Sequence, residues 1–242
     1  MEAKTKDLWV FIETNEDGTP MRVGLELLNP GRMMADKQGG KLVGIVVGNN
    51  VAPTVEQAGI YGADQVIYVE GPEYQHYTTD AYTKALYYLV EKYGPTTVMI
   101  GATNNGRDLG PRLSSRLQTG LTADCTRLDV KVSNYQEYLR KATNVPEEKI
   151  QALDASDMNL KMTRPAFGGN VMATIVCRKY RPQMATVRPG VMALGECDTT
   201  RTGEIIMEDA GLSEADMNVE ILKVAKNEKK AVDITDAKIL VS

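Results

Sequence analysis

Short apolar runs alternate with segments of helical periodicity along the first part of the chain. The clearest helix spans Thr78–Tyr93, where apolar side chains recur every three or four positions, and Thr78 or Thr79 can cap its start. Two further helices are predicted, over Arg22–Lys37 and Pro53–Tyr61. Buried strands are predicted over the apolar runs between them, Asp7–Glu13, Lys41–Val47, Gln65–Val69 and Thr96–Ile100. This alternation indicates an α/β fold with a parallel sheet and right-handed crossover connections.

The pattern changes after Leu121, where glycine, proline and β-branched residues become more frequent and no long helix is predicted. Strands are predicted over Val171–Cys177, Gln183–Val187, Glu204–Met207 and Val219–Val224. Pro182 and Pro189 flank the second of these strands, and because proline cannot donate to a ladder, this strand is predicted at a sheet edge. The polar segment Tyr135–Asp154 is interpreted as a surface excursion.

The composition is that of an ordinary globular protein. Of 242 residues, 43% are hydrophobic and 25% are charged, and the formal net charge is -4. Binding to nucleic acid or to anionic membranes is disfavoured, because both usually need an excess of basic residues. No apolar stretch approaches the roughly 20 residues of a membrane span, and the amino terminus lacks the apolar run of a signal peptide. A cytoplasmic location is therefore expected.

Few residues of this chain suit catalysis or metal binding. The cysteines are Cys125, Cys177 and Cys197, with no CxxC pair, and His76 is the single histidine. This inventory argues against a disulfide framework, a structural metal site and a Cys–His or Ser–His dyad, so no catalytic or metal-binding residue is assigned. The cysteines are interpreted as core thiols and His76 as a solvated loop residue.

A glycine-bearing turn, Gly101–Asp108, follows a predicted strand and precedes a helix. The spacing of its two glycines matches that of a P-loop, but Arg107-Asp108 stands where a Lys–Ser/Thr pair would hold phosphate and magnesium. An acid at that position would repel phosphate, so a strand–turn–helix connection is favoured over nucleoside triphosphate binding. The arginines along this helix are interpreted as solvated or interface-facing: Arg107, Arg112 and Arg116.

The segment Met162–Asn170, with the sequence MTRPAFGGN, is the most unusual in the chain. Pro165 fixes one φ angle, the Gly168–Gly169 pair allows positive φ, and Arg164 is biased to extended backbone because a proline follows it. A stiff turn that carries one arginine suits recognition of a planar anion. An ordinary β-hairpin turn with an exposed arginine fits these residues equally well.

Three long runs carry a family resemblance: IGATNNGRDLGPRLSSRLQTGLTADC, TRPAFGGNVMATIVC and RPQMATVRPGVM. Over nearly its whole length the chain resembles the N-terminal domain of the electron-transfer flavoprotein α subunit. It looks closer to bacterial and archaeal members, including electron-bifurcating ones, than to the mitochondrial type. The resemblance implies a Rossmann-like, adenine-nucleotide-hydrolase-like α/β domain with a parallel sheet and additional antiparallel strands in its second half. It assigns residues 1–230 to this domain, and 231–242 to a linker and the first strand of a missing C-terminal FAD-binding domain.

The resemblance also implies a heterodimer. The family's β subunit is a similar α/β domain that binds FAD in bifurcating members and AMP in the others, and the α subunit carries FAD on its C-terminal domain. One FAD is therefore expected on the β subunit near this chain, and one on the missing domain. Electrons would pass between a dehydrogenase or NADH and a further acceptor, with an acyl-CoA or 2-hydroxy-acid dehydrogenase as the expected partner. The chain is then an electron carrier and not a stand-alone catalyst.

Arg164 is the one residue predicted to contact a cofactor. In the family, its segment lies near the β-subunit interface, so its guanidinium is expected to face the isoalloxazine ring of the partner-bound flavin. Two alternatives come from outside the family, a nucleotide-binding regulatory domain of the universal-stress type and a hydrolase on the same scaffold. The chain offers no His–carboxylate–nucleophile set for a hydrolase, and saturable ATP binding would favour the regulatory domain.

Overall fold

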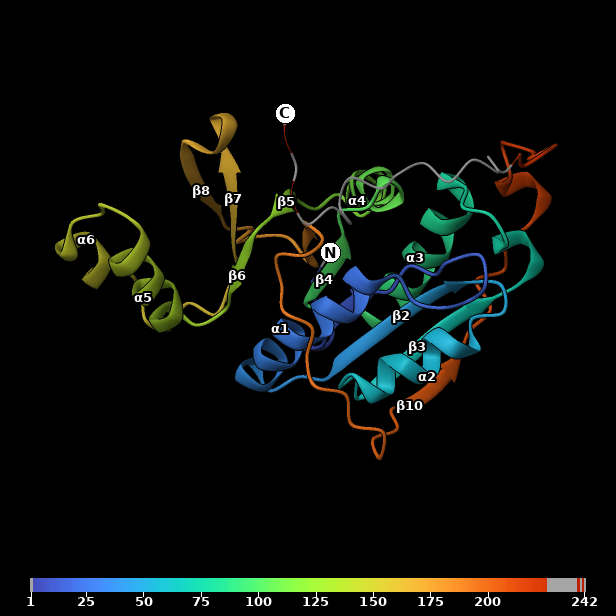
Figure 1. Ribbon diagram of the computed structural model, residues 1–242, viewed down its shortest axis with the longest axis horizontal. Helices are drawn as coiled ribbons and strands as arrows, with labels where there is room; N and C mark the ends of the chain where they lie inside the picture. Colours follow the sequence, from blue (N-terminus) through green and yellow to red (C-terminus); the bar gives the residue numbers. More distant parts are fainter. Residues whose placement is uncertain (1, 226–238, 240, 242) are drawn as a thin grey trace.

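The computed structural model describes residues 2–225, 239 and 241, and the strands of this part of the chain form two sheets (Figure 1). In the larger sheet the described strands follow the order β10-β3-β2-β1-β4-β9-β5, and all neighbours are parallel. Its strands are β1 (Leu8–Phe11), β2 (Leu42–Gly48), β3 (Gln65–Glu70), β4 (Thr97–Gly101), β5 (Leu121–Cys125), β9 (Gln183–Val187) and β10 (Glu204–Met207). The smaller, antiparallel sheet contains β6 (Arg127–Asp129), β7 (Lys161–Ala166) and β8 (Val171–Ile175).

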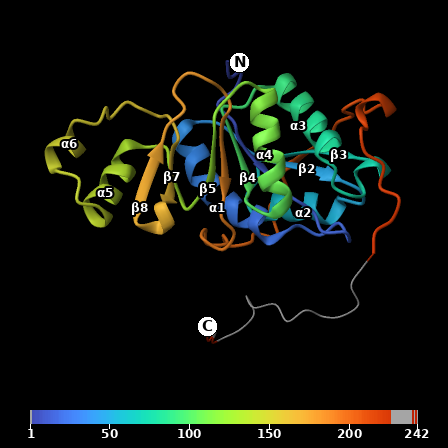
Figure 2. The ribbon, with the colours of Figure 1, turned by 90° about the horizontal axis from the view of Figure 1, so that it is seen from above.

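Helices cover both faces of the parallel sheet (Figure 2). They are α1 (Arg22–Gln38), α2 (Ala52–Ile60), α3 (Thr79–Tyr93) and α4 (Asn104–Arg116), followed outside this sheet by α5 (Val132–Ala142) and α6 (Glu147–Gln151). Leu27 and Val55, from α1 and α2, lie in one core cluster, and Leu86 and Leu113, from α3 and α4, lie in another. Burial on two faces explains why β1, β2 and β4 are apolar without alternation. The predicted α/β fold, with a parallel sheet and later antiparallel strands, is confirmed.

The elements predicted in the first part of the chain lie close to their predicted bounds. Gly39 ends α1 in left-handed backbone at φ 69°, a conformation that glycine adopts without strain. The start of α3 differs from the prediction. Thr78 is the N-cap residue but makes no capping hydrogen bond with its side chain, and the Thr79 hydroxyl donates to Asp108 instead. Neither threonine side chain therefore caps α3.

β9 lies inside the parallel sheet, between β4 and β5, so the predicted edge position is wrong. All of its residues are buried. Pro182 and Pro189 lie just outside the strand, so the N–H groups of β9 itself remain available to both neighbours. The two prolines bound this central strand and do not interrupt it.

The polar segment of the second half contains helix, which the sequence pattern did not predict. α5 has 11 residues, and its two buried side chains, Val132 and Leu139, are two turns apart and lie on one face. α5 and α6 project from the parallel sheet beside the antiparallel strands (Figures 1 and 2). The predicted surface excursion is therefore confirmed, but its backbone is largely helical.

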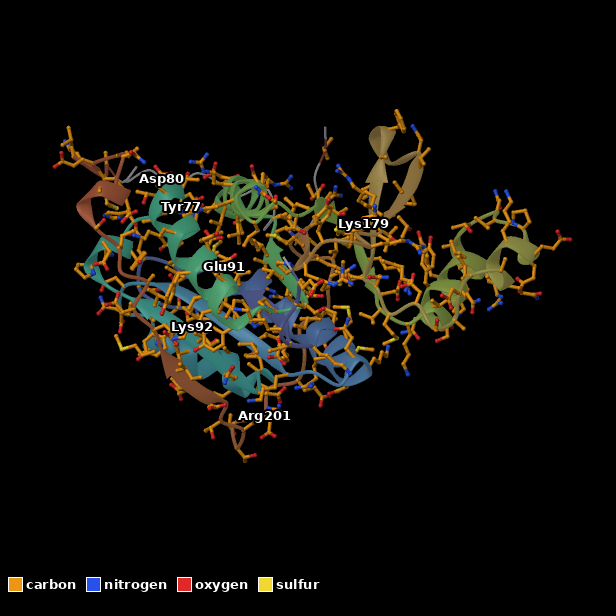
Figure 3. The ribbon with its side chains drawn as sticks, turned by 180° about the vertical axis from the view of Figure 1, so that it is seen from behind. Tyr77, Asp80, Glu91, Lys92, Lys179 and Arg201 are labelled. Atoms are coloured by element: carbon orange, nitrogen blue, oxygen red, sulfur yellow. The ribbon has the colours of Figure 1, made fainter. Side chains whose placement is uncertain are left out.

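One prediction for the end of the chain is wrong, and another lies almost entirely outside the described residues. The segment Val219–Val224 is irregular, so the strand predicted there is wrong. The linker and strand expected over 231–242 fall outside the described residues at all positions but 239 and 241. The chain that follows β10 runs back over α3, where Lys92 pairs with Glu208 at 2.7 Å, and Figure 3 shows Lys92 toward the end of that helix.

Candidate functional site

The carboxyl ends of the parallel strands meet at one edge of the large sheet, where open α/β sheets usually bind their ligands. β2 and β3 lie on one side of β1, and β4, β9 and β5 lie on the other, so the strand order changes direction between β1 and β4. The residues at the ends of these central strands are Glu13 after β1, Thr103 after β4, Arg188 after β9 and Asp124 near the end of β5. Their side chains decide what this edge can bind.

Polar side chains fill the crevice between β1 and β4. The Glu13 carboxylate accepts hydrogen bonds from the Thr103 hydroxyl at 2.5 Å and from the Asn105 amide at 2.6 Å. The Thr103 hydroxyl caps α4 by accepting from the Gly106 N–H at 2.9 Å. A carboxylate here lies at the helix N-terminus where a nucleotide phosphate would otherwise be held. The crevice therefore disfavours an anionic nucleotide, and no sequence motif marked Glu13.

The P-loop-like turn is a strand–turn–helix connection, as predicted. Gly106 is required by space, because a Cβ atom there would lie 1.9 Å from the Gly101 carbonyl oxygen. Asp108 accepts a hydrogen bond from the Tyr77 hydroxyl at 2.6 Å and another from Thr79. These hydrogen bonds, from Thr79 and Tyr77, hold the pKa of Asp108 below its usual value. The Asp108 carboxylate is thus hydrogen-bonded to Thr79 of α3 and to Tyr77 in the loop before α3, which is labelled in Figure 3.

A cavity of ≈ 200 Å³ lies beside this turn, lined by Glu13, His76 and Tyr77 among others. His76 is half-buried at this cavity, so the predicted solvated histidine is only partly correct. Ligand sites usually have volumes of about 300–1,000 Å³. The cavity is therefore small for a nucleotide.

The three arginines of α4 are exposed, as predicted, and each has a different partner. Arg112 pairs with Asp80 at 3.4 Å, and the Arg116 guanidinium lies 4.7 Å from the centre of the Tyr87 ring. Arg107 differs from these two, because its guanidinium pairs with Asp124 at the end of β5, at the edge of the parallel sheet.

Asp124 organises the end of β5. Its backbone is left-handed at φ 60°, which is uncommon for a residue other than glycine, and its N–H donates to the Thr186 hydroxyl at 2.9 Å. Its carboxylate accepts from the Arg188 guanidinium at 2.5 Å and from Arg107 at 3.1 Å. The hydrogen bond from Arg188 lowers the pKa of Asp124, against the effect of burial, and the charge of Arg107 adds to the lowering. This cluster holds one carboxylate between two guanidinium groups.

The same strand end joins the parallel sheet to the antiparallel one. The Cys125 carbonyl oxygen accepts from the Arg188 N–H at 3.0 Å, and the Thr126 N–H donates to the Thr163 carbonyl oxygen at 2.9 Å. Thr163 belongs to β7 and precedes Arg164. The end of β5 thus fixes the β7–β8 hairpin beside the arginine cluster.

Arg164 lies on β7 opposite Ala173 of β8, so it is on a strand and not on the turn that follows. It shares a face of the strand with the buried Met162, because side chains alternate along a strand. Arg164 is half-buried, and its Nε atom is buried without a hydrogen-bond partner among the described residues. Burial raises the pKa of the Cys125 thiol to about 12, and the nearby charge of Arg164 opposes that rise. No hydrogen bond from the half-buried Arg164 side chain is made within the described residues, so its accessible N–H donors are free for an acceptor from another molecule.

The turn of the hairpin is formed by Phe167–Gly169, and its three residues have φ angles of 49°, 67° and 91°. Both glycines therefore adopt the positive φ that their lack of a side chain allows. Apolar side chains of the hairpin are exposed, led by Phe167 at 83%. The others are Val171, Met172 and Ile175. A projecting hairpin with this surface is typical of a contact with another protein.

The cysteines occupy three environments. Cys125 is buried as predicted, Cys177 is half-buried against the core, and Cys197 is exposed, so the prediction of a core thiol is wrong for Cys197. Across the part of the chain that the structure describes, no group of three or more His, Cys, Asp or Glu side chains is arranged to hold a metal ion. None of the helices described here combines the length and apolar character needed to cross a membrane.

Comparison with known protein families shows which family this chain belongs to. The family model for the electron transfer flavoprotein domain matches residues 8–212. The chain belongs to the electron transfer flavoprotein family. The resemblance found from the sequence runs is thereby confirmed, and the matched range contains the strand-end cluster and the hairpin.

Curated relatives in this family match nearly the whole chain. It is 44% identical over 239 residues to the acryloyl-CoA reductase electron transfer subunit beta of Anaerotignum propionicum, covering 98% of this chain and 65% of that protein. It is 42% identical over 237 residues to the electron transfer flavoprotein subunit alpha of Thermoanaerobacterium thermosaccharolyticum, covering 98% of this chain and 64% of the relative. Protein FixB of Rhizobium meliloti is 40% identical over 221 residues, with 90% and 56% covered. The chain thus spans less than two thirds of the length of these flavoprotein relatives.

Proposed function

We propose that residues 1–230 of this chain form the N-terminal domain of the α subunit of a heterodimeric electron transfer flavoprotein. The complex passes electrons from a dehydrogenase or NADH through FAD to a further acceptor, with flavin-based bifurcation as one mode. Family membership and the relatives named as α subunits support this proposal. The relative named for acryloyl-CoA reductase supports a partner dehydrogenase that acts on acyl-CoA substrates.

We assign one FAD to the β subunit, next to the hairpin, and one to the C-terminal domain of the whole α subunit. FAD supplies the redox chemistry when bound, and the protein supplies orientation and charge. Arg164 is the residue of this chain that fits such a group. Its planar guanidinium offers several N–H donors, and its buried Nε has no acceptor within the described residues.

The half-buried guanidinium of Arg164, which makes no hydrogen bond within the described residues, is the observation that carries this assignment. An arginine beside the flavin favours its reduced form, because reduction adds negative charge to the ring system. A charge pair at roughly 5 Å and an effective dielectric constant of about 20 is worth about 3 kcal/mol. That energy corresponds to about 130 mV for one electron, which is an upper bound because water screens the pair.

The substitution Arg164→Ala in the reconstituted heterodimer tests the assignment. We expect the reduction potential of the partner-bound flavin to fall by up to about 130 mV, and Arg164→Lys to restore only part of it because lysine lacks the planar fork. Spectroelectrochemistry measures the potential, and Arg112→Ala is a control that removes the same charge from the outer surface of α4. An unchanged potential in Arg164→Ala would refute the role of this arginine.

The proposed heterodimer uses the exposed surface of the hairpin. β8 is an edge strand of the small sheet; its residue Met172 is exposed, as is Phe167 in the turn that precedes it. An apolar edge of this kind is normally covered by another chain, and permanent heterodimers commonly bury about 2,000 Å² or more. Size-exclusion chromatography with light scattering should show a complex with the β subunit. A monomer that ignores added β subunit and binds ATP saturably would favour the universal-stress alternative, which the Glu13 carboxylate opposes.

A further inference from the structure

Arg107 and Arg188 lie together at the end of β5 and carry two positive charges, whereas the carboxylate that pairs with both supplies one negative charge. Arg107 and Arg188 share the single carboxylate of Asp124. Arg107 also donates from Nε to the Ala102 carbonyl oxygen at 3.0 Å, and both Nε and Nη2 of Arg188 point to Asp124. Each guanidinium has five N–H donors, so each retains donors without an acceptor among the described residues. The chain as a whole has a net charge of -4, so this local excess of positive charge runs against the average.

The pair is held in place before any partner arrives. The loop that carries Arg188 is tied at one end by the Arg188 N–H to the Cys125 carbonyl oxygen at 3.0 Å. At the other end, the Gly190 N–H donates to the buried Glu26 carboxylate at 2.9 Å. Asp124 is itself fixed by left-handed backbone and by its hydrogen bond from N–H to Thr186. Groups held in this way lose little conformational entropy when they bind.

The pair is also open to other molecules. The side chains of Arg107 and Arg188 are 53% and 46% exposed, while that of Asp124 is only 17% exposed. This exposure suits a surface contact more than an enclosed small-molecule site. Through the hydrogen bond between Thr126 and Thr163, the pair adjoins the hairpin with its exposed apolar side chains. Apolar residues flanked by arginine are typical of protein–protein interfaces.

We propose that Arg107 and Arg188, positioned by Asp124, form a docking site for an acidic side chain of the partner subunit. This inference rests on the proposed heterodimer and extends its surface from the hairpin to the end of the parallel sheet. The planar guanidinium fork matches a carboxylate with two parallel hydrogen bonds. Since both arginines are half-exposed, their main effect is on the rate of association and on its dependence on salt.

The association of the full-length α subunit with the β subunit tests this site. Its rate constant is measured by surface plasmon resonance between low and moderate ionic strength, for Arg107→Gln/Arg188→Gln and for Arg112→Gln/Arg116→Gln. The second variant removes two charges from the same helix region, where the partners are Asp80 and Tyr87. We expect the first variant to associate about tenfold more slowly at low salt and with a weaker salt dependence, and the control to stay within about twofold of the unmodified chain.

Asp124→Asn separates docking from a role in folding. Asparagine keeps a side-chain oxygen that can accept from the guanidiniums and removes only the negative charge between them. A docking site therefore predicts association at low salt at least as fast as in the unmodified chain. Slower association in this variant, or equal rates in the two arginine variants, overturns the inference. If the unmodified chain fails to bind the β subunit, the proposed heterodimer is refuted, and the docking site is refuted with it. Thermal unfolding of each variant confirms that the chain remains folded at the temperature used.

Discussion

The parallel sheet and the hairpin lobe, which comprises β6–β8, α5 and α6, place their apolar residues differently. β1, β2 and β4 are buried along their whole length between two layers of helices. In the lobe, β8 has no fully buried residue, and Phe167 lies open to solvent at the turn. Both regions use the same β-forming residue types. The difference shows that the parallel sheet is stabilised by its own packing, while the lobe leaves apolar side chains exposed at its hairpin.

The largest expected contrast comes from removing one apolar side chain from each region. Leu86 of α3 is 1% exposed, and Met172 of β8 is 43% exposed. Leu86→Ala should lower the free energy of unfolding by about 2–5 kcal/mol, because it leaves a cavity in the core. Met172→Ala should lower it by less than about 1 kcal/mol, because close to half of this residue is already exposed to water. Urea denaturation measures both, and losses of equal size would contradict the distinction between the two regions.

A smaller contrast is between a partly buried charged group in the parallel-sheet region and an exposed one in the lobe. Asp64 joins α1, β2 and the loop before β10, because it accepts from Arg32, from the Leu42 N–H at 2.9 Å and from Arg201 at 2.6 Å, which Figure 3 shows on that loop. Burial raises the pKa of Asp64, but the hydrogen bonds from Arg32 and Leu42 and the charges of both arginines outweigh it, and the pKa falls below its usual range. Asp64→Asn should cost about 1–2 kcal/mol at neutral pH, a modest value because water screens the partly exposed pairs.

The pH dependence of this variant follows from the lowered pKa. Ionised Asp64 stabilises the folded state above the unfolded pKa, and that stabilisation is lost as the pH falls through the folded pKa. The unmodified chain should therefore lose more stability than Asp64→Asn between about pH 5 and pH 2. Glu147→Gln, in an exposed ion pair of the lobe, is the control and should change unfolding little. Acid titrations followed by circular dichroism distinguish these outcomes, and parallel curves for Asp64→Asn and the unmodified chain would argue against the assignment.

The smallest expected effect compares two glycines of similar geometry. Gly39 ends α1 at φ 69°, and Gly168 lies in the hairpin turn at φ 67°, and a Cβ atom would meet nothing within 4 Å at either position. Alanine should therefore cost about 1 kcal/mol of backbone strain at each site. In Gly39→Ala that cost should appear in global unfolding, whereas in Gly168→Ala it should appear as faster amide exchange confined to β7 and β8. A loss of global stability in Gly168→Ala as large as that in Gly39→Ala would show that the lobe unfolds together with the sheet.

Sequence patterns predicted the first part of the fold well because its elements are regular and fully buried. The Thr78–Tyr93 helix and the strands before it have periodicities that a single chain segment displays by itself. The pattern does not predict α5, because only Val132 and Leu139 of this helix are buried, and two apolar positions in a polar segment give a weak periodicity. β9 was placed at an edge because flanking prolines resemble interrupting ones when the strand bounds are unknown.

The residues of the candidate site also differ in how well the sequence alone indicates them. Arg164 stood out in the sequence, since a following proline and a nearby glycine pair are local features. No sequence feature indicates a role for Glu13 or Asp124, because the residues that hydrogen-bond to their carboxylates are distant in the sequence. Glu13 and Thr103 are 90 positions apart, and Asp124 and Arg188 are 64 apart.

By itself, the sequence of this protein determined its family, the alternation of strands and helices, and the glycine-bearing turn close to Arg164. Local backbone preferences and short-range periodicity act within a few residues, so they can be read without knowing the fold. Only the tertiary structure decided that β9 is a central strand, that Glu13 fills the crevice between β1 and β4, and that two distant arginines share Asp124. These features depend on which strand ends meet at one edge of the sheet. That order is set by packing of the whole chain, and no single segment encodes it.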